Sequence, residues 1–238
     1  MTHLKPSALM LRSAGLAALA LPLAFLGACA SHDASMDALD PDMIAPFSTF
    51  EPGVVQGWKT DTTNPRDGQA QAVWQVLSDE GAPSLPNSVA LVNAMEHAGQ
   101  TFNLFWDPSI SLKDVDLTVT VRADGGEEDQ GGGPAWRIGS ASDYYVARWN
   151  PLEDNFRVYS VVGGERLQLA TAKVHPDPDS WHTIRIQHIG SRIKCSFDGE
   201  MLLDVIDSKL SEAGGVGVWT KADATTSFHN FGYKKAGV

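Results

Sequence analysis

Two arginines, Arg148 and Arg157, occupy matching positions in two runs of alternating apolar and polar residues, Tyr144–Asn150 and Asn155–Val161. Neighbouring side chains in a strand point to opposite faces, so the apolar members of each run predict a core face and leave both arginines on the other face. A planar guanidinium binds carboxylates and ligands rich in oxygen acceptors. The two runs therefore predict a hairpin whose outer face gathers cations.

The same alternation adds residues from two further runs, Ala135–Ile138 and Val216–Lys221. In the first run it assigns Trp136 and Ile138 to the core. If all four strands share a sheet, the outer face combines Arg137, Arg148, Asn150, Asn155, Arg157, Tyr159, Trp219 and Lys221. Exposed aromatic rings accept the apolar C–H face of a sugar, while arginine and asparagine bind its hydroxyl groups, so this face suits a saccharide.

A second interpretation of this face remains open. Cross-strand ion pairs on a solvated sheet use the same residue types, with Glu153 and Asp154 as carboxylate partners for the arginines. In that case each pair contributes little to stability and the face binds no ligand. Alternation along the strands does not decide between the two.

Common catalytic and metal-binding motifs are absent from the sequence. It contains no Glu-x-Asp-x-x-Glu pair of carboxylates for a retaining glycosidase, no Gly-x-Ser-x-Gly elbow, no His-Glu-x-x-His and no phosphate loop. The loop Asp124–Asp129 carries four carboxylates, which would suit calcium, but it lacks EF-hand spacing. We interpret it as a solvated acidic loop, with a calcium site as the alternative, and expect no other cofactor.

The elements that would position the outer face are short strands. Asp114–Arg122 alternates strictly, with four apolar residues on one face, and similar runs recur through the rest of the chain. Phe197–Glu200 carries the Asp-Gly pair typical of a tight hairpin, and only Val89–His97 could form a helix of any length. This pattern predicts an all-β fold of two packed antiparallel sheets, a sandwich or jelly roll.

The N-terminal region has the features of an export signal. Residues 1–28 hold two basic residues and an apolar run that is too short to span a bilayer, which needs about 20 residues. Leu26-Gly27-Ala28 before Cys29 is typical of a bacterial lipoprotein signal, in which Cys29 is lipidated; the alternative is an ordinary cleaved signal peptide. Residues 29–46 are small and acidic, which predicts a flexible tether, and residues 47–238 form the domain.

Charge and cysteine content limit the partners. The chain carries a net charge of −11, which disfavours nucleic-acid binding. If Cys29 is lipidated, only Cys195 remains, so no internal disulfide is expected and Cys195 is predicted to be a buried apolar residue. The expected contact with a membrane is through the lipid anchor alone, at the bacterial cell envelope on the periplasm-facing outer membrane.

Several segments together resemble a known bacterial family. They are Trp136-Arg137, Tyr144–Tyr159, Trp181–Arg185, Phe197-Asp198-Gly199 and Gly217–Asp223. They resemble the 3-keto-disaccharide hydrolase domains, which are often grouped loosely with family-16 glycoside hydrolases, over about residues 47–233. The resemblance implies a concanavalin A-like jelly roll whose concave face is the usual saccharide site. Two of the family's elements differ here: Gly131-Gly132-Gly133 replaces an Asn-Ser-Gly motif, and His229-Asn230 replaces an acidic pair.

The resemblance also implies a chemistry. The ketone of a 3-keto sugar acidifies the C2 proton, so one base and nearby cations suffice for elimination of the C1 substituent. Glu153 or Asp154 would be the base, and Arg148, Arg157 and Lys221 would stabilise the enolate. We favour a lipid-anchored protein that recognises carbohydrate; the alternatives are an active 3-keto-disaccharide hydrolase and a structural envelope module without ligand.

Overall fold

The computed structural model describes residues 39–53, 57–83, 87–94 and 97–237, which fall within the unit Asp33–Val238. The predicted signal segment, Cys29 and residues 29–38 of the predicted tether lie outside these residues. Within the described ranges, no helix has the length and apolar character needed to cross a membrane.

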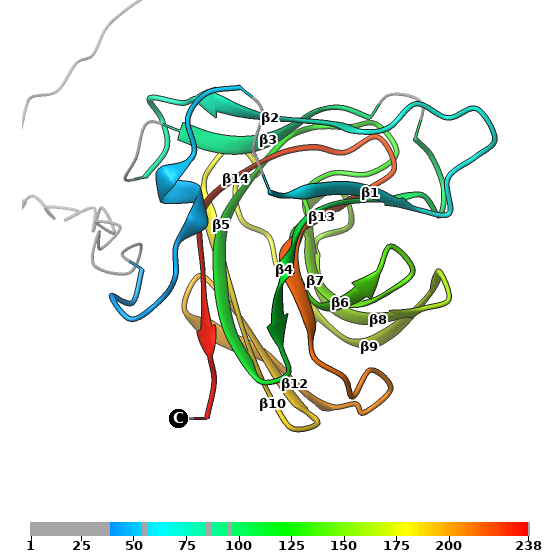
Figure 1. Ribbon diagram of the computed structural model, residues 1–238. Coiled ribbons are helices and arrows are strands. Elements are labelled where there is room, and N and C mark those ends of the chain that lie inside the picture. Colours follow the sequence, from blue (N-terminus) through cyan, green and yellow to red (C-terminus); the bar gives the residue numbers. More distant parts are fainter. Residues whose placement is uncertain (1–38, 54–56, 84–86, 95–96, 238) are drawn as a thin grey trace, which may run out of the picture. The chain divides into compact units, whose positions relative to one another are not determined.

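Two antiparallel sheets of seven strands each make up this unit (Figure 1). Sheet I has the order β1 (Lys59–Thr63), β4 (Phe102–Leu112), β13 (Gly214–Lys221), β6 (Gly133–Ser140), β7 (Asp143–Asn150), β8 (Asn155–Val162) and β9 (Glu165–Lys173). Sheet II has the order β12 (Glu200–Ile206), β11 (Arg192–Phe197), β10 (His182–Ile189), β5 (Val115–Gly125), β14 (Thr225–Lys235), β3 (Asn87–Asn93) and β2 (Val73–Ser78). The short 3₁₀ helices η1 (Pro46–Thr49) and η2 (Pro151–Glu153) complete the described elements. The prediction of an all-β sandwich is confirmed.

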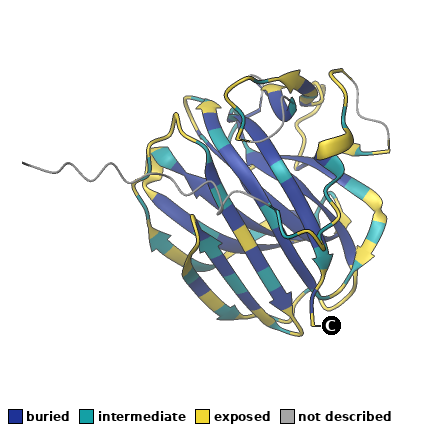
Figure 2. Ribbon diagram, turned by 90° about the vertical axis from the view of Figure 1, so that its left-hand side faces the viewer, coloured by how far each residue is buried: buried dark blue, intermediate teal, exposed yellow. Residues whose placement is uncertain are grey.

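The main core lies between the two sheets. Strand β5 contributes Val115, Leu117, Val119 and Val121, as its alternation predicts. Cys195 of β11 is also part of this core, and burial raises the pKa of its thiol well above the ordinary range. Figure 2 views the side on which β5 and β14 lie and shows buried segments along the central strands, with exposed segments at turns and outer strands.

A second apolar cluster covers the opposite face of sheet I. It consists of Phe102, Leu104, Trp106, Ala135, Ile138, Tyr144, Val146, Tyr159, Val161 and Trp219. Figure 1 shows sheet I bending from β1 through β13 to β8 and β9, so this face is the inside of the bend. Sheet I is therefore apolar on both faces, and the face that was expected to be solvated is largely buried.

Two segments differ from expectation. The helix considered for Val89–His97 is wrong over Asn87–Asn93, which forms strand β3 between β2 and β14. Ile44, in the segment predicted to be a flexible tether, exchanges backbone hydrogen bonds of 2.8 and 3.0 Å with Tyr233 of β14. Contacts with the folded unit therefore begin before residue 47.

Candidate functional site

The buried carboxylate of Asp129 is the centre of a polar cluster on sheet I, at one end of the face that carries the second apolar cluster. It accepts a hydrogen bond from Arg148 Nη2, one of 2.9 Å from Asn150 Nδ2 and one of 2.5 Å from Lys221 Nζ. The side chains of Asp129 and Arg148 are 1% and 2% exposed. Buried charges need partners of opposite sign, and here one carboxylate serves two cations.

The loop after β5 holds Asp129 in place. Asp223 Oδ2 accepts from the backbone N–H of Glu127 at 2.6 Å and of Glu128 at 3.0 Å, and Asp223 Oδ1 accepts from that of Asp129 at 2.9 Å. Partial burial acts to raise the pKa of Asp223, but these backbone donors outweigh it and lower the pKa below its ordinary value. Gly126 makes the turn at φ +131°. The prediction of a fully solvated acidic loop is wrong for Asp129, which this turn directs inward.

A second carboxylate, Glu153, lies nearer to solvent. Its Oε2 accepts from Arg157 Nη1 at 2.8 Å and from Asn155 Nδ2 at 2.9 Å, and it lies 3.9 Å from Arg148 Nη1. Partial burial acts to raise the pKa of Glu153, but the Asn155 hydrogen bond and the charges of Arg148, Arg157 and Lys221 outweigh it, so the pKa is lowered. Glu153 is therefore an ionised, weakly basic carboxylate at neutral pH.

The short helix η2 determines where the two candidate bases point. Asn150 Oδ1 caps it by accepting from Leu152 N at 2.9 Å, and it ends at Asp154 in the left-handed region with φ 53°. Glu153 consequently faces the arginines, whereas Asp154 pairs with His175 Nδ1 at 2.9 Å. Of the two predicted bases, only Glu153 contacts the predicted binding residues.

An aromatic group adjoins the cations on the same face, and it is covered by Arg166 of β9. The guanidinium carbon of Arg166 lies 4.4 Å from the ring centre of Tyr159, 5.0 Å from that of Phe102 and 5.8 Å from that of Trp219. Trp219 is fully buried and donates from Nε1 to Tyr144 Oη at 3.0 Å. The expectation of exposed aromatic rings is wrong for both Trp219 and Tyr159, because Arg166 and the aromatic neighbours enclose them.

Seven of the eight predicted binding residues lie on one face of sheet I, on the adjacent strands β7 and β8 and on β13, which β6 separates from them: Arg148, Asn150, Asn155, Arg157, Tyr159, Trp219 and Lys221. Arg137 does not. It adopts φ 48° where the β6–β7 register shifts, and its guanidinium donates to the carbonyls of Lys113, Leu210 and Gly190. The same irregularity moves Ile138 from the predicted core to the second apolar cluster.

Three buried polar atoms on this face make no hydrogen bond within the described part of the chain: Arg148 Nε, Asn155 Oδ1 and Arg166 Nη1. A buried donor or acceptor without a partner costs about 1–3 kcal/mol. We call the residues Asp129, Arg148, Asn150, Glu153, Asn155, Arg157, Tyr159, Arg166 and Lys221 the arginine face. It has four cations and two carboxylates, a positive surplus on an acidic chain.

No group of three or more histidine, cysteine, aspartate or glutamate side chains in the described ranges is arranged to hold a metal ion. Asp129, the one buried carboxylate of the Asp124–Asp129 loop, is occupied by its cations and by Asn150.

Comparison with known proteins shows the fold. No protein-family model and no curated protein sequence matches this chain. Among solved structures it is similar to the carbohydrate-binding module CBM66 from Bacillus subtilis, at 20% identity over 75% of this chain and 96% of that one, with a TM-score of 0.57. It is also similar to the globular domain of T. cruzi calreticulin, at 11% identity over 76% and 84% of the two chains, with a TM-score of 0.51. A galectin-like protein of unknown function from Bacillus subtilis aligns at 12% identity over 76% and 90%, with a TM-score of 0.50. The chain has a concanavalin A-like jelly-roll fold.

Proposed function

We propose that the protein recognises a carbohydrate on its arginine face. The observation that carries this proposal is the group of buried, unpartnered polar atoms on Arg148, Asn155 and Arg166. Hydroxyl groups both donate and accept, so a sugar can pair with the guanidinium N–H groups and with the amide oxygen of Asn155 at once. Pairing these atoms removes the cost of burying them alone.

The charge of the face narrows the class of sugar. Two carboxylates do not neutralise four cations, and Glu153 and Arg157 are 45% and 29% exposed, so they are accessible to a ligand from solvent. This surplus favours a saccharide rich in oxygen acceptors, such as one that carries a uronate or a ketone. The jelly-roll fold, which this chain shares with a carbohydrate-binding module, is consistent with such a role but does not identify the sugar.

Replacement of Tyr159 by phenylalanine tests the proposal. Tyr159→Phe removes one hydroxyl, which interacts within the described residues with the partly exposed Arg157, so the fold should remain about as stable as the wild type. Calorimetric titration with neutral and uronate-containing oligosaccharides should show a Kd about fivefold weaker, the effect of one lost hydrogen bond. Tyr233→Phe on β14 of sheet II is the matched control and should bind normally. Equal affinities for all three proteins, or no binding of any of these sugars, would contradict the proposal.

The second candidate function is hydrolysis of a 3-keto-disaccharide, and the position of Glu153 favours it. In this route Glu153 takes the C2 proton and the charge passes to the C3 ketone oxygen as an enolate. The C1–O bond then breaks, the leaving group is protonated, and water adds at C1 while a proton returns to C2. Arg148, Arg157 and Lys221, whose charges already act on Glu153, would stabilise the enolate.

Turnover separates the second candidate from simple binding. The purified protein should release monosaccharide from a 3-keto-disaccharide, and Glu153→Gln should abolish release while Asp154→Asn leaves it unchanged, because Asp154 pairs with His175 instead. Binding without product supports recognition alone. A protein that neither binds nor turns over a sugar would instead be a structural module of the envelope.

We also propose that Cys29 is lipidated and holds the domain at a membrane surface of the bacterial envelope, on the periplasm-facing outer membrane. The basis is the Leu26-Gly27-Ala28-Cys29 sequence after a short apolar run. Expression in a bacterium fed a labelled fatty acid should label the wild type and leave Cys29→Ser unlabelled.

Calcium is the remaining metal candidate for the Asp124–Asp129 loop. A chelator that lowers glycan affinity, with recovery on adding calcium, would support it.

A further inference from the structure

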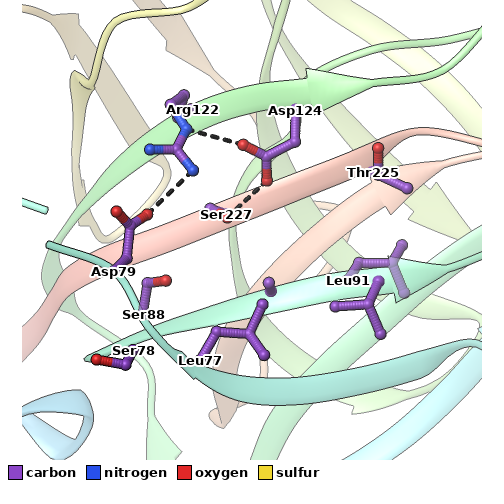
Figure 3. A pocket seen from close by; sticks show the side chains of 11 residues that line it. Leu77, Ser78, Asp79, Ser88, Leu91, Arg122, Asp124, Thr225 and Ser227 are labelled. Atoms are coloured by element: carbon purple, nitrogen blue, oxygen red, sulfur yellow. Dashed lines mark hydrogen bonds and ion pairs between the residues drawn. The ribbon is translucent and has the colours of Figure 1, made fainter. Parts of the chain in front are cut away.

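A cavity of about 560 Å³ opens on the outer face of sheet II, on strands that do not carry the arginine face (Figure 3). Strands β2, β3, β5 and β14 line it, and its volume falls within the range of roughly 300–1,000 Å³ that is typical of small-molecule sites. We propose that this cavity is a second saccharide-binding site, which takes a single neutral sugar unit independently of the arginine face.

One wall of the cavity is a chain of polar side chains. Arg122 contacts Asp79 Oδ2 through Nη2 at 3.0 Å and Asp124 Oδ1 through Nε at 2.8 Å, and Ser227 Oγ donates to Asp124 Oδ2 at 2.5 Å. Figure 3 shows these four side chains linked along one side of the pocket. Each carboxylate oxygen has a second lone pair that can accept from a sugar hydroxyl.

The other wall is apolar and includes Leu77, Leu91 and Val92. Figure 3 shows Leu77 and Leu91 across from the ion pairs of Arg122. A pyranose or furanose ring presents hydroxyl groups at its edge and C–H groups on its faces, so one ring can contact both walls of such a cavity.

Ser88 supplies the observation that points to a ligand. This residue is 2% exposed and lines the cavity, and its buried hydroxyl makes no hydrogen bond within the described residues. A buried unpaired hydroxyl is costly, and a sugar hydroxyl in the cavity can pair with it. The site is therefore built with a free donor and acceptor between its polar and apolar walls.

The charges of the cavity disfavour anionic ligands. Asp79 and Asp124 outnumber Arg122, so an anion would be repelled. A cation–π contact also holds Arg122 in place, because its guanidinium carbon lies 4.7 Å from the ring centre of Trp181. Burial acts to lower the pKa of Arg122, but Asp124 and Asp79 outweigh it and raise the pKa, so the guanidinium stays charged. A neutral hydroxylated ring uses these fixed donors and acceptors without adding charge.

Site-resolved titration tests this proposal. Isotope-labelled protein would be titrated with glucose, galactose, mannose, fructose, sucrose and cellobiose while the amide signals of Ser88 and Ser227 and the Nε signal of Arg122 are followed by NMR. At least one sugar should shift all three signals with a common Kd. Ser88→Ala should weaken that Kd about fivefold without destabilising the fold, since no hydrogen bond within the described residues is lost.

Cavity filling provides the second measurement. Val92 is 37% exposed and lines the cavity, so Val92→Trp should abolish the shifts at Ser88 and Arg122. Val73 of β2 is 40% exposed but does not line it, so Val73→Trp should bind as the wild type does. Absence of shifts with all six sugars, equal binding by Val92→Trp, or salt-sensitive binding of glucosamine alone would overturn the proposal. Signals of Arg148 and Lys221 report the arginine face separately, so either site can fail alone.

Discussion

Arg148 and Arg157 lie directly opposite each other in the β7–β8 pair, yet their guanidinium groups donate hydrogen bonds to different carboxylates. Arg148 donates to the buried Asp129, and Arg157 donates to the half-exposed Glu153. Two like charges placed opposite each other in a sheet repel, so each arginine needs its own counterion. The two ion pairs differ in burial, and this difference predicts different effects of mutation.

Asp129→Asn should be strongly destabilising. The substitution leaves Arg148 and Lys221 without their shared carboxylate, and removal of one partner of a buried ion pair costs about 3–5 kcal/mol. Urea unfolding followed by far-UV circular dichroism measures the loss. Glu127→Gln, a substitution in the same loop, is the control and should change stability by less than about 0.5 kcal/mol. Similar midpoints for the two variants would show that Asp129 does not hold the cations.

Glu153→Gln should have a much smaller effect on stability. Glu153 is half-exposed and its hydrogen-bonded partner Arg157 is partly exposed, so solvent screens this pair and we expect a loss of at most about 1 kcal/mol. The same unfolding measurement, repeated in high salt, should bring the variant and the wild type closer together. A loss as large as that of Asp129→Asn would mean that Glu153 is a structural counterion and would weaken its candidacy as a base.

Gly126→Ala should disrupt the loop that carries Asp129. An added Cβ would lie 1.9 Å from the carbonyl oxygen of Asp129, and the φ of +131° is one that residues with side chains rarely adopt. Gly163→Ala is the matched control, since Gly163 also has positive φ but a methyl group added there would have no atom within 4 Å. Thermal unfolding should show a drop in Tm several times larger for Gly126→Ala than for Gly163→Ala.

His188 predicts a loss of stability at mildly acidic pH. Burial and the charge of Arg137 lower its pKa from 6.5 to about 4, while its Nδ1 accepts from Trp136 Nε1 at 2.9 Å. Between these two pH values the unfolded state binds more protons than the folded state, so stability falls as pH falls from 6.5 to 4, by about 3 kcal/mol in all. Urea midpoints across this range measure the slope.

His188→Gln should flatten that slope, because glutamine keeps an acceptor for Trp136 but does not titrate. His175→Gln is the control and should retain the wild-type slope, since His175 is more than half exposed. An unchanged slope in His188→Gln would assign the acid sensitivity to other groups.

Alternation along the strands was sufficient to predict most of the fold. It identified the two sheets, the core face of β5 and the shared face of β7, β8 and β13, because a residue period of two follows directly from strand geometry. It failed for Arg137, where a positive φ and a shifted register interrupt the period. Strand β3 was mistaken for a helix candidate because four consecutive buried residues hide the alternation.

The polar partners of the site were harder to predict. The sequence around Asp129 is as acidic as that around Glu127 and Glu128, so it does not show which carboxylate is buried. The backbone hydrogen bond from Asp129 to Asp223 is part of what directs Asp129 inward. Arg166 lies in a predicted strand, but its position over Tyr159 and Trp219 depends on the bending of sheet I. The contacts of Asp129 with Asp223 and of Arg166 with Trp219 join segments far apart in the sequence, so local pattern carries no signal for them.

The β7–β8 register has a consequence for folding fidelity. Arg148 and Arg157 alternate with Trp149 and Phe156, which pack in the main core. A slip of one residue in either strand would turn its guanidinium toward that core and its aromatic ring toward Asp129 and Glu153. A misaligned hairpin would therefore bury an unpaired charge and be less stable than the native register. The arginines proposed to hold a sugar thus also select the register in which β7 and β8 pair.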